Sequence, residues 1–344
     1  MAAAQIARRP NGTFANPWGS SGRLPGLGAV LKWSVQRLLS RPAHSISRRE
    51  FAARFPLATN DFPTPRAPPP DVVITWAGHS SFLIQIGGRN ILTDPVWSSR
   101  ASPFQWLGPK RWAPPAIPFA NLPPIDAVVI SHDHYDHLDD PIIRRLARLD
   151  PPPRWYAPLG VGSWLERRGA RGVREFSWWD QDEWTDPGFP SPLTITATPA
   201  QHFSGRGLTS RNRTLWCGWN IRTHDRSVWF AGDTGRHPAF AEIGAALGPL
   251  DAILMPVGAY DPQWFMAPVH MSPEDAVAAF SETTAAAPHP DGRIPIMAGM
   301  HWGTFKLTDE SMDEPPDRTR RAWAAAGLPP DRLWIPAHGE SRTL

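Results

Sequence analysis

SHDHYDHLD, residues 131–139, directly follows the apolar run IDAVVI at 125–130, and these two stretches together decide how the chain folds. The apolar run predicts a buried strand, and the histidines lie at its C-terminal end. Because residues two apart on an extended chain face the same side, His132 and His134 can bind one metal ion. The chain then turns, so Asp136 and His137 can reach a second ion. Imidazole and carboxylate ligands without a thiolate favour zinc.

Three further residues occupy the same kind of position just after an apolar strand. His202 follows LTITATPAQ, Asp233 follows SVWFAG, and His301 follows IPIMAGM. With the four residues of the first motif they make seven ligands, which is enough for two ions with three private ligands each and one shared ligand. Asp233 is the expected bridge because a carboxylate has two oxygens.

Short β-branched runs alternating with helical patterns predict the fold class. The expected strands are 72–76, 82–86, 90–94, 126–131, 193–198, 214–221, 227–231, 251–255 and 294–298. The expected helices are 140–149, 160–168, 238–247, 273–284 and 319–326. Pairs of strands followed by mixed strands and helices favour a layered α/β sandwich over a doubly wound sheet. Residues 71–344 form the expected catalytic domain, and residues 1–70, ending in a proline cluster, form an N-terminal extension.

Composition excludes several classes of protein. Of the 344 residues, 41% are hydrophobic and 19% are charged, so the chain can fill a large core. The net charge of +3 argues against a nucleic-acid-binding protein. The single cysteine, Cys217, excludes an internal disulfide framework.

The N-terminal extension contains one amphipathic segment, residues 27–39 (LGAVLKWSVQRLL), with its leucines and valines on one helical face. The segment predicts either an interfacial helix that rests on an anionic membrane or a helix packed on the main domain. No run is long and apolar enough to span a bilayer, and no export signal is found. The expected location is therefore the cytoplasm, without secretion and with peripheral contact at the inner face of a membrane.

The wider sequence resembles the metallo-β-lactamase fold hydrolases, and within them the N-acylphosphatidylethanolamine-hydrolysing phospholipase D branch. The pattern H-x-H-x-D-H followed by H, G-D-T and H is shared by the whole fold family. The blocks that indicate the branch are Asn16-Pro17-Trp18, Leu92 to Pro103, Gly108 to Arg111, Leu122 to Val128, Phe230 to Gly235, Gly258 to Tyr260, Trp264 to Met266, His301 to Phe305 and His338 to Arg342.

This resemblance implies a four-layer αββα sandwich and a role for each site residue. His132, His134 and His202 would hold the first of two zinc ions. Asp136, His137 and His301 would hold the second, Asp233 would bridge them, and the carboxylates of Asp136 and Asp233 would be catalytic. Tyr135 and His270 match positions that contact the phospholipid.

The implied reaction is that of a dinuclear zinc phosphodiesterase of phospholipase D type. It would hydrolyse N-acylphosphatidylethanolamine to N-acylethanolamine and phosphatidic acid, and the branch also implies a homodimer. The alternative is a lactonase or phosphodiesterase of the same fold that acts on a small soluble substrate. The aromatic insert at 97–122 is either a lipid-lined mouth or a proline-braced loop over a sheet edge.

Residues beside the ligands are expected to orient them. Asp133 and Asp139 are predicted to do so from outside the ligand set. His79, in Gly78-His79-Ser80, is either another such residue or a structural histidine.

Overall fold

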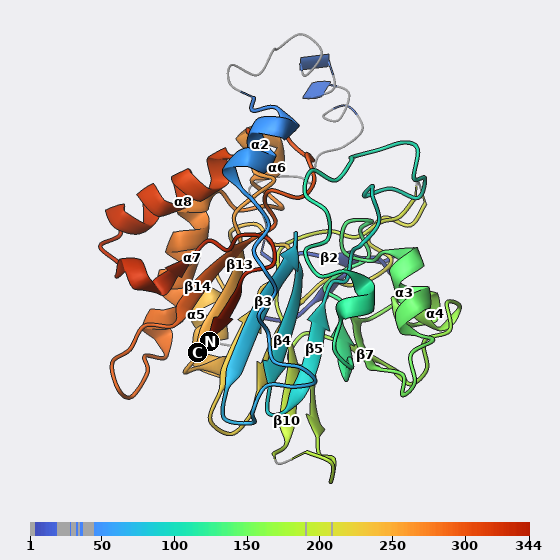
Figure 1. Ribbon diagram of the computed structural model, residues 1–344. Coiled ribbons are helices and arrows are strands. Elements are labelled where there is room, and N and C mark those ends of the chain that lie inside the picture. Colours follow the sequence, from blue (N-terminus) through green and yellow to red (C-terminus); the bar gives the residue numbers. More distant parts are fainter. Residues whose placement is uncertain are drawn as a thin grey trace.

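The computed structural model describes residues 4–18, 28, 32, 33, 35, 36, 45–189, 191–207 and 209–344. Two seven-stranded sheets pack face to face, and helices cover the outer face of each (Figure 1). Helices α5, α7 and α8 lie on one side, and α3 and α4 on the other (Figure 1). This αββα order confirms the predicted α/β sandwich.

The first sheet has the strand order β16-β3-β4-β5-β6-β7-β8. Its strands are β3 (Val72–Gly78), β4 (Ser81–Ile86), β5 (Arg89–Thr93), β6 (Ala127–Val129), β7 (Arg154–Pro158), β8 (Val173–Phe176) and β16 (Ser341–Thr343). Its outer helices are α3 (Asp140–Leu146) and α4 (Gly162–Glu166). Strands β5 to β8 run parallel, and β3, β4 and β5 form an antiparallel meander. Strands β3, β5 and β6 therefore all end at the same edge.

The second sheet has the order β15-β14-β13-β12-β11-β10-β9. Its strands are β9 (Gln181–Trp184), β10 (Leu193–Thr198), β11 (Gly218–Arg222), β12 (Ser227–Phe230), β13 (Ala252–Pro256), β14 (Ile296–Met300) and β15 (Leu333–Trp334). Its outer helices are α5 (Phe240–Leu247), α7 (Pro273–Ala286) and α8 (Glu314–Ala325). Strands β10, β12 and β14 run in the same direction, so their C-terminal ends lie at one edge of the sheet.

Smaller elements complete the described chain. They are β1 (Ala7–Arg8), β2 (Phe14–Ala15), α2 (Arg48–Arg54), α6 (Gln263–Met266) and two 3-10 turns, Phe119–Asn121 and Pro330–Arg332. No helix among the described residues is both long and apolar enough to cross a bilayer. Most of the amphipathic segment predicted at 27–39 lies outside the described residues.

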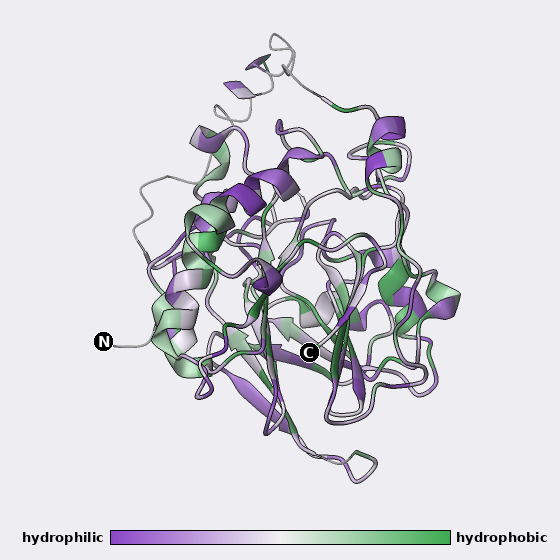
Figure 2. Cartoon of the chain, turned by 60° about the vertical axis from the view of Figure 1, so that its left-hand side comes forward, coloured by the Kyte–Doolittle hydropathy of each residue, from purple (hydrophilic) through white to green (hydrophobic). Residues whose placement is uncertain are grey.

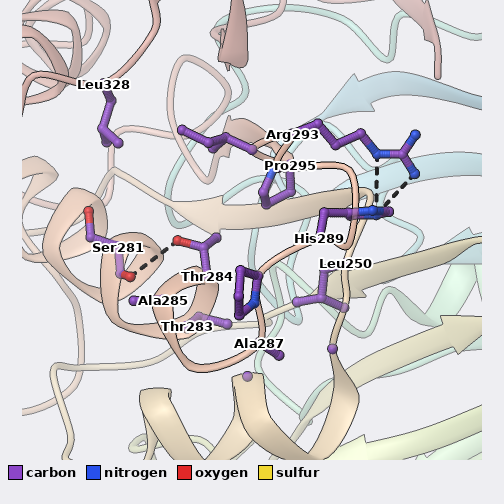
Figure 3. Close-up of a pocket in the computed structure, with 15 residues that line it drawn as sticks. Leu250, Ser281, Thr283, Thr284, Ala285, Ala287, His289, Arg293, Pro295 and Leu328 are labelled. Carbon is purple, nitrogen blue, oxygen red and sulfur yellow. Dashed lines mark hydrogen bonds between the residues drawn. The ribbon is translucent and has the colours of Figure 1, made fainter.

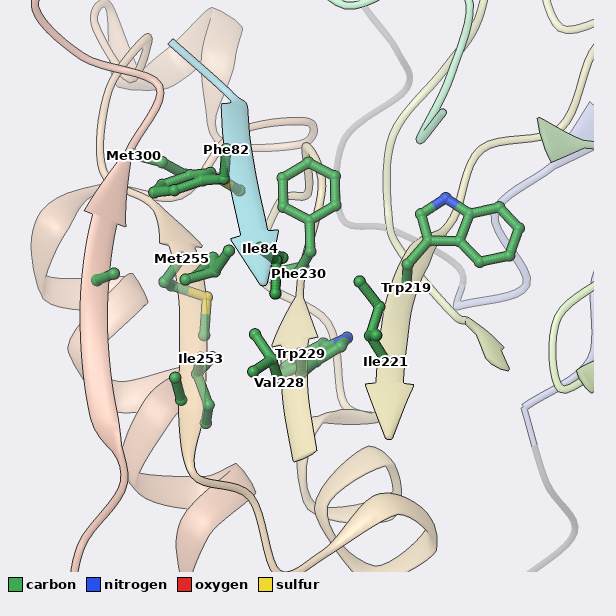
Figure 4. Packing of buried hydrophobic residues seen from close by; sticks show 14 of the residues in the cluster. Phe82, Ile84, Trp219, Ile221, Val228, Trp229, Phe230, Ile253, Met255 and Met300 are labelled. Carbon is green, nitrogen blue, oxygen red and sulfur yellow. The ribbon is translucent and has the colours of Figure 1, made fainter. Parts of the chain in front are cut away.

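Side-chain alternation along the strands creates two hydrophobic clusters. In β4, Phe82 and Ile84 belong to the cluster between the sheets, whereas Leu83 packs beneath α3 and α4. Figure 4 shows the shared cluster, with Phe82 and Ile84 from the first sheet and Phe230 and Met255 from the second. In Figure 2 hydrophobic residues accordingly concentrate on the central strands. Since both faces of each sheet are covered, the central strands are largely apolar.

Residues 4–18 pack on the body of the molecule although they begin the predicted extension. Phe14 is buried in the central cluster, and its amide donates to the carbonyl of Asn212. The Asn16 side-chain amide donates to the carbonyl of His202 at 3.0 Å. Trp18 stacks on His237, with ring centroids 4.4 Å apart. The start of the chain therefore contacts the loops that follow β10 and β12.

Helix α8 begins earlier than predicted, at Glu314 rather than Thr319. Pro315 and Pro316 occupy its first turn, where a missing N–H costs nothing because first-turn amides have no partner within the helix. Helix α7 begins as predicted at Pro273, after an N-cap at Ser272 whose side chain accepts from the amide of Asp275.

Gly244 permits the close approach of α5 to α7. A Cβ atom at this position would lie 2.0 Å from the carbonyl oxygen of Thr283. We expect Gly244→Ala to destabilise the fold by about 3 kcal/mol, although alanine raises helix propensity by about 1 kcal/mol. The two effects have opposite signs, so denaturant unfolding of the metal-loaded protein distinguishes them. Ala245→Ser, on the exposed side of the same turn, is the control, and a stabilised Gly244→Ala variant would contradict the packing argument.

Candidate metal centre

The candidate ligands gather where strands of both sheets end. His132, His134, Asp136 and His137 follow β6, and the other three ligands, His202, Asp233 and His301, follow β10, β12 and β14. All of these strands finish at the same edge, so seven residues that are far apart in the sequence form one buried centre. The structure thus brings together every ligand that the strand-end pattern predicts.

The first group consists of three histidines. The Nδ1 atom of His134 lies 2.8 Å from Nε2 of His132 and 3.2 Å from Nε2 of His202. His134 therefore directs its Nδ1 atom towards the other two rings, whereas His132 and His202 direct their Nε2 atoms towards His134. The three nitrogens lie within 4.8 Å of one another, so they can bind one ion.

The second group consists of Asp136, His137 and His301. Oδ2 of Asp136 lies 3.5 Å from Nε2 of His137 and 3.5 Å from Nε2 of His301. Ligands at about 2.1 Å from a tetrahedral zinc ion lie about 3.4 Å from one another. The observed separations therefore fit three ligands of one such ion.

Asp233 lies between the two groups. Its Oδ2 atom is 3.1 Å from Nε2 of both His137 and His301. The same oxygen is 3.9 Å from Nε2 of His132 and 3.8 Å from Nε2 of His202. This carboxylate thus contacts both groups, as a bridging ligand must.

Several buried atoms of the centre have no hydrogen-bond partner within the described chain. Three of them are Oδ1 of Asp233, Nε2 of His137 and Nε2 of His301, and a fourth is Nδ1 of His301. Burying an unsatisfied polar group costs about 1–3 kcal/mol. Bound cations would satisfy the first three atoms, so the residues present fit a pair of metal ions.

The two groups differ in the pKa values of their histidines. Burial lowers the pKa of His134 to about 3 and that of His202 to about 4, so both rings are neutral at pH 7. Burial also disfavours protonation of His301 and His137, but the carboxylates of Asp233 and Asp136 raise the pKa of His301 to about 9 and that of His137 well above its ordinary value. At pH 7 the second group therefore binds protons that a metal ion has to displace.

This difference predicts a pH dependence of metal binding. Because the pKa values of His301 and His137 are both raised, zinc has to displace at least one proton, and its affinity for the second group should fall at least about tenfold for each pH unit lost. Affinity of the first group should stay nearly constant from pH 8 to pH 5, since His134 and His202 bind protons only below that range. Chelator-competition titrations at pH 6, 7 and 8 measure both slopes. Equal slopes for the two ions would contradict the assignment.

Asp94 is a functional residue that the ligand pattern did not identify. This fully buried carboxylate accepts from Nδ1 of His137 at 2.7 Å and from the Ser131 amide at 2.7 Å. The Nδ1 proton of His137 leaves Nε2 free to face the centre. His202 is oriented in the same way, because its Nδ1 atom donates to the carbonyl of Val269 at 2.9 Å. Asp94 follows β5, the neighbour of β6, so the strand-end rule that found the ligands also applies to it.

Asp133 and Asp139, which are predicted to orient the ligands, instead accept hydrogen bonds from backbone amides of neighbouring loops. Asp133 accepts from the amide of Gly205 at 2.7 Å. Asp139 accepts from the amides of Trp97 at 3.0 Å and Ser98 at 2.8 Å. Their side chains therefore hold the adjoining loops, which include the start of the aromatic insert.

The two predicted substrate contacts lie in different surroundings. The hydroxyl of Tyr135 donates to the carbonyl of Arg206 at 2.7 Å, and the Arg206 guanidinium lies 4.0 Å above the tyrosine ring. His270 is buried beside the centre, with its ring 5.1 Å from that of His202 and 5.2 Å from that of His301.

A cavity of about 370 Å³ opens at the centre. Its polar lining includes His134, Asp136, Asp233 and His270. Its apolar lining consists of Phe203, Phe265, Met266, Val269 and Leu307. The arrangement can hold an anion at the ligands and an apolar chain beside them.

A second cavity, of about 250 Å³, lies beside α5 and α7 (Figure 3). Its hydroxyls are satisfied locally: Ser281 donates to the carbonyl of Val277, and Thr284 to that of Ser281. None of the candidate ligands lines it. The reactive groups are therefore at the first cavity.

Known proteins resemble this chain in sequence and fold. The family described as "Beta-lactamase superfamily domain" matches residues 89–290. The protein of Caenorhabditis elegans named N-acyl-phosphatidylethanolamine-hydrolyzing phospholipase D 1 is 39% identical over 253 residues, 72% of this chain and 68% of that protein. An uncharacterized protein of Mycobacterium tuberculosis is 41% identical over 288 residues, 84% of this chain and 72% of that protein. The isothiocyanate hydrolase structure from Delia radicum gut bacteria has a TM-score of 0.59 at 20% identity, covering 78% of this chain and 98% of that one, and shares the fold.

Proposed function

Because the chain belongs to the β-lactamase superfamily, in its N-acylphosphatidylethanolamine-hydrolysing phospholipase D branch, we propose that it is a dinuclear zinc phosphodiesterase. The chain is a metal-dependent hydrolase, as its relatives are. The proposed reaction is hydrolysis of N-acylphosphatidylethanolamine to N-acylethanolamine and phosphatidic acid. The observation that carries the proposal is a shared carboxylate, Asp233, between two three-ligand groups at the mouth of a largely apolar cavity.

The metal ions, when bound, supply a water-derived nucleophile at neutral pH and neutralise charge on the phosphate oxygens. His132, His134 and His202 would hold one ion, and Asp136, His137 and His301 the other, with Asp233 shared. Asp94 holds the ring of His137 through Nδ1, and the Val269 carbonyl does the same for His202. These bonds fix which nitrogen faces the substrate side, so the centre needs little rearrangement before reaction.

The cavity wall suits the rest of a phospholipid. Phe203, Phe265, Met266, Val269 and Leu307 present apolar surface next to the ligands, where an acyl chain can be buried. His270 lies on the same wall, so its ring can contact the headgroup. We assign substrate contact to His270, and to Tyr135, whose hydroxyl is bound to the Arg206 carbonyl in the loop 203–207 that lines the cavity.

Exposed apolar side chains on both sides of the centre support contact with a membrane. Trp106 is 74% exposed, and Phe104 and Leu107 next to it in the insert are also exposed. On the other side Trp264 is exposed in α6, the helix whose Phe265 and Met266 line the cavity. Aromatic side chains of this kind are favoured at the lipid–water interface. Lys110 in the insert adds a positive charge that suits anionic lipid.

We therefore expect Trp106→Ala to weaken vesicle binding about tenfold, because a large apolar side chain contributes about 1.5–3 kcal/mol on burial. Trp106→Phe should retain most of the binding. Turnover of a short-chain monomeric phosphodiester should be unchanged in both variants, since the residue lies outside the cavity. Vesicle sedimentation and kinetics on both substrates measure these effects, and unaltered vesicle binding by Trp106→Ala would rule out the contact.

A turnover assay tests the proposed function. Zinc-loaded protein is given N-acylphosphatidylethanolamine in mixed micelles, and the products are identified by mass. Release of N-acylethanolamine together with phosphatidic acid supports the proposal. Absence of both products, combined with turnover of a soluble lactone or phosphodiester, would instead establish the alternative hydrolase of a small substrate.

A further inference from the structure

We infer that His79 is a positioning residue of the second metal group, because it contacts both Asp136 and His301. This inference rests on the proposed dinuclear centre. His79 follows β3 in the first sheet and is buried, with 1% of its surface exposed. It is not among the seven ligands. Its contacts nevertheless reach ligands that follow strands of both sheets.

The side chain of His79 contacts Asp136 directly. Its Nε2 atom lies 2.9 Å from Oδ2 of Asp136, the same oxygen that faces His137 and His301. Its Nδ1 atom has no hydrogen-bond partner among the described residues. Because an ionised carboxylate only accepts, the ring proton resides on Nε2 and is donated to Asp136. The bond fixes the rotation of the carboxylate and directs one oxygen towards the second group.

The backbone of His79 contacts the other side of the same group. Its carbonyl oxygen accepts from the amide of His301 at 3.1 Å and from the indole of Trp76 at 2.8 Å. Its own amide donates to the hydroxyl of Thr304 at 2.7 Å. His301 follows β14 of the second sheet, so this residue of the first sheet connects the two halves of the sandwich at the metal group.

The shape of the site favours histidine at this position. The backbone has φ of +57°, a left-handed conformation in which histidine and asparagine are found more often than most residues. The ring packs 4.1 Å from the His301 ring and 5.2 Å from the Phe305 ring. A smaller side chain would leave a gap there and would release Asp136.

Three variants distinguish the role of the His79 side chain from that of its backbone. His79→Ala removes the donor and the packing. His79→Asn tolerates the backbone conformation, but its amide is too short to replace Nε2. His79→Gln restores an N–H donor at about the original reach. His289→Ala, at a partly buried histidine of the second cavity, is the control for loss of an imidazole.

Stepwise affinities for Zn²⁺ and absorption spectra with Co²⁺ provide readouts that do not require turnover. We expect His79→Ala and His79→Asn to weaken binding of the second ion by about 10–100-fold and leave the first unchanged. His79→Gln should recover part of the loss, and His289→Ala should match the wild type. Unchanged affinities, or equal losses at both groups in folded protein, would overturn the inference. These titrations contain no lipid, so their outcome is independent of whether the wild type hydrolyses N-acylphosphatidylethanolamine.

Discussion

Asp233→Asn is expected to lower kcat/KM by about 10³-fold or more. The Oδ2 atom of Asp233 lies within 3.9 Å of four histidine Nε2 atoms, so both metal groups depend on one carboxylate. An asparagine oxygen carries no charge and cannot compensate two cations. Stabilisation of transition-state charge by metal ions contributes several kcal/mol, and each 1.36 kcal/mol corresponds to a tenfold change in rate.

Kinetics and metal content are measured together for this variant. Asp251→Asn is the matched control, because Asp251 is also a buried carboxylate but pairs with Arg226 and Arg293 away from the centre. The control should lose stability and keep its metal ions. Near-normal turnover by a folded Asp233→Asn variant would show that the shared carboxylate is not required.

The second large effect is expected at Asp94. Three donors converge on its carboxylate: the amide and the hydroxyl of Ser131, and Nδ1 of His137. An asparagine offers one oxygen and turns its own N–H groups towards the remaining donors, so at least one buried donor stays unpaired. His137 can escape this conflict only by moving its proton to Nε2, the atom that faces the metal group. We therefore expect Asp94→Asn to weaken binding of the second ion by about 10–100-fold.

Chelator-competition titrations measure this loss, with denaturant unfolding as a second measurement. Unfolding should show a loss of about 1–3 kcal/mol from the unpaired donor. Ser131→Ala removes a single donor to Asp94 and keeps the His137 contact, so its effect on affinity for the second ion should be smaller. Only the second ion is compared, because the Ser131 hydroxyl also contacts Nδ1 of His132. If Asp94→Asn binds both ions as tightly as the wild type, the orienting role assigned to Asp94 is wrong.

The sequence predicts the centre of the fold better than its edges. All nine predicted runs overlap observed strands, because buried strands of a covered sheet are largely apolar. The interior strand β7 (RWYAP) is not among the predicted runs, since its apolar stretch is short and bounded by prolines. Strands β8 (VREF) and β9 (QDEW) lie at sheet edges, where side chains face water, and their polar composition resembles that of loops. Strand pairing, rather than composition, identifies them.

The gathering of the candidate ligands could be predicted because they follow a local rule, a polar residue just after a buried strand. Contacts between separate loops follow no such rule. The hydroxyl of Tyr135 is bound by the Arg206 carbonyl, and Asp133 by the amide of Gly205, so both depend on the conformation of a loop 70 or so positions further along the chain. The contact of His79 with Asp136 likewise requires β3 and β6, which β4 and β5 separate in the sheet, to end at the same edge.

The dinuclear centre is tested most directly by locating the metals in crystals of the zinc-loaded protein. Anomalous diffraction at the zinc edge should show two ions, one among His132, His134 and His202, and one among Asp136, His137 and His301. The Asp233 carboxylate should lie between them. A single ion, or ions bound away from these residues, would contradict the account.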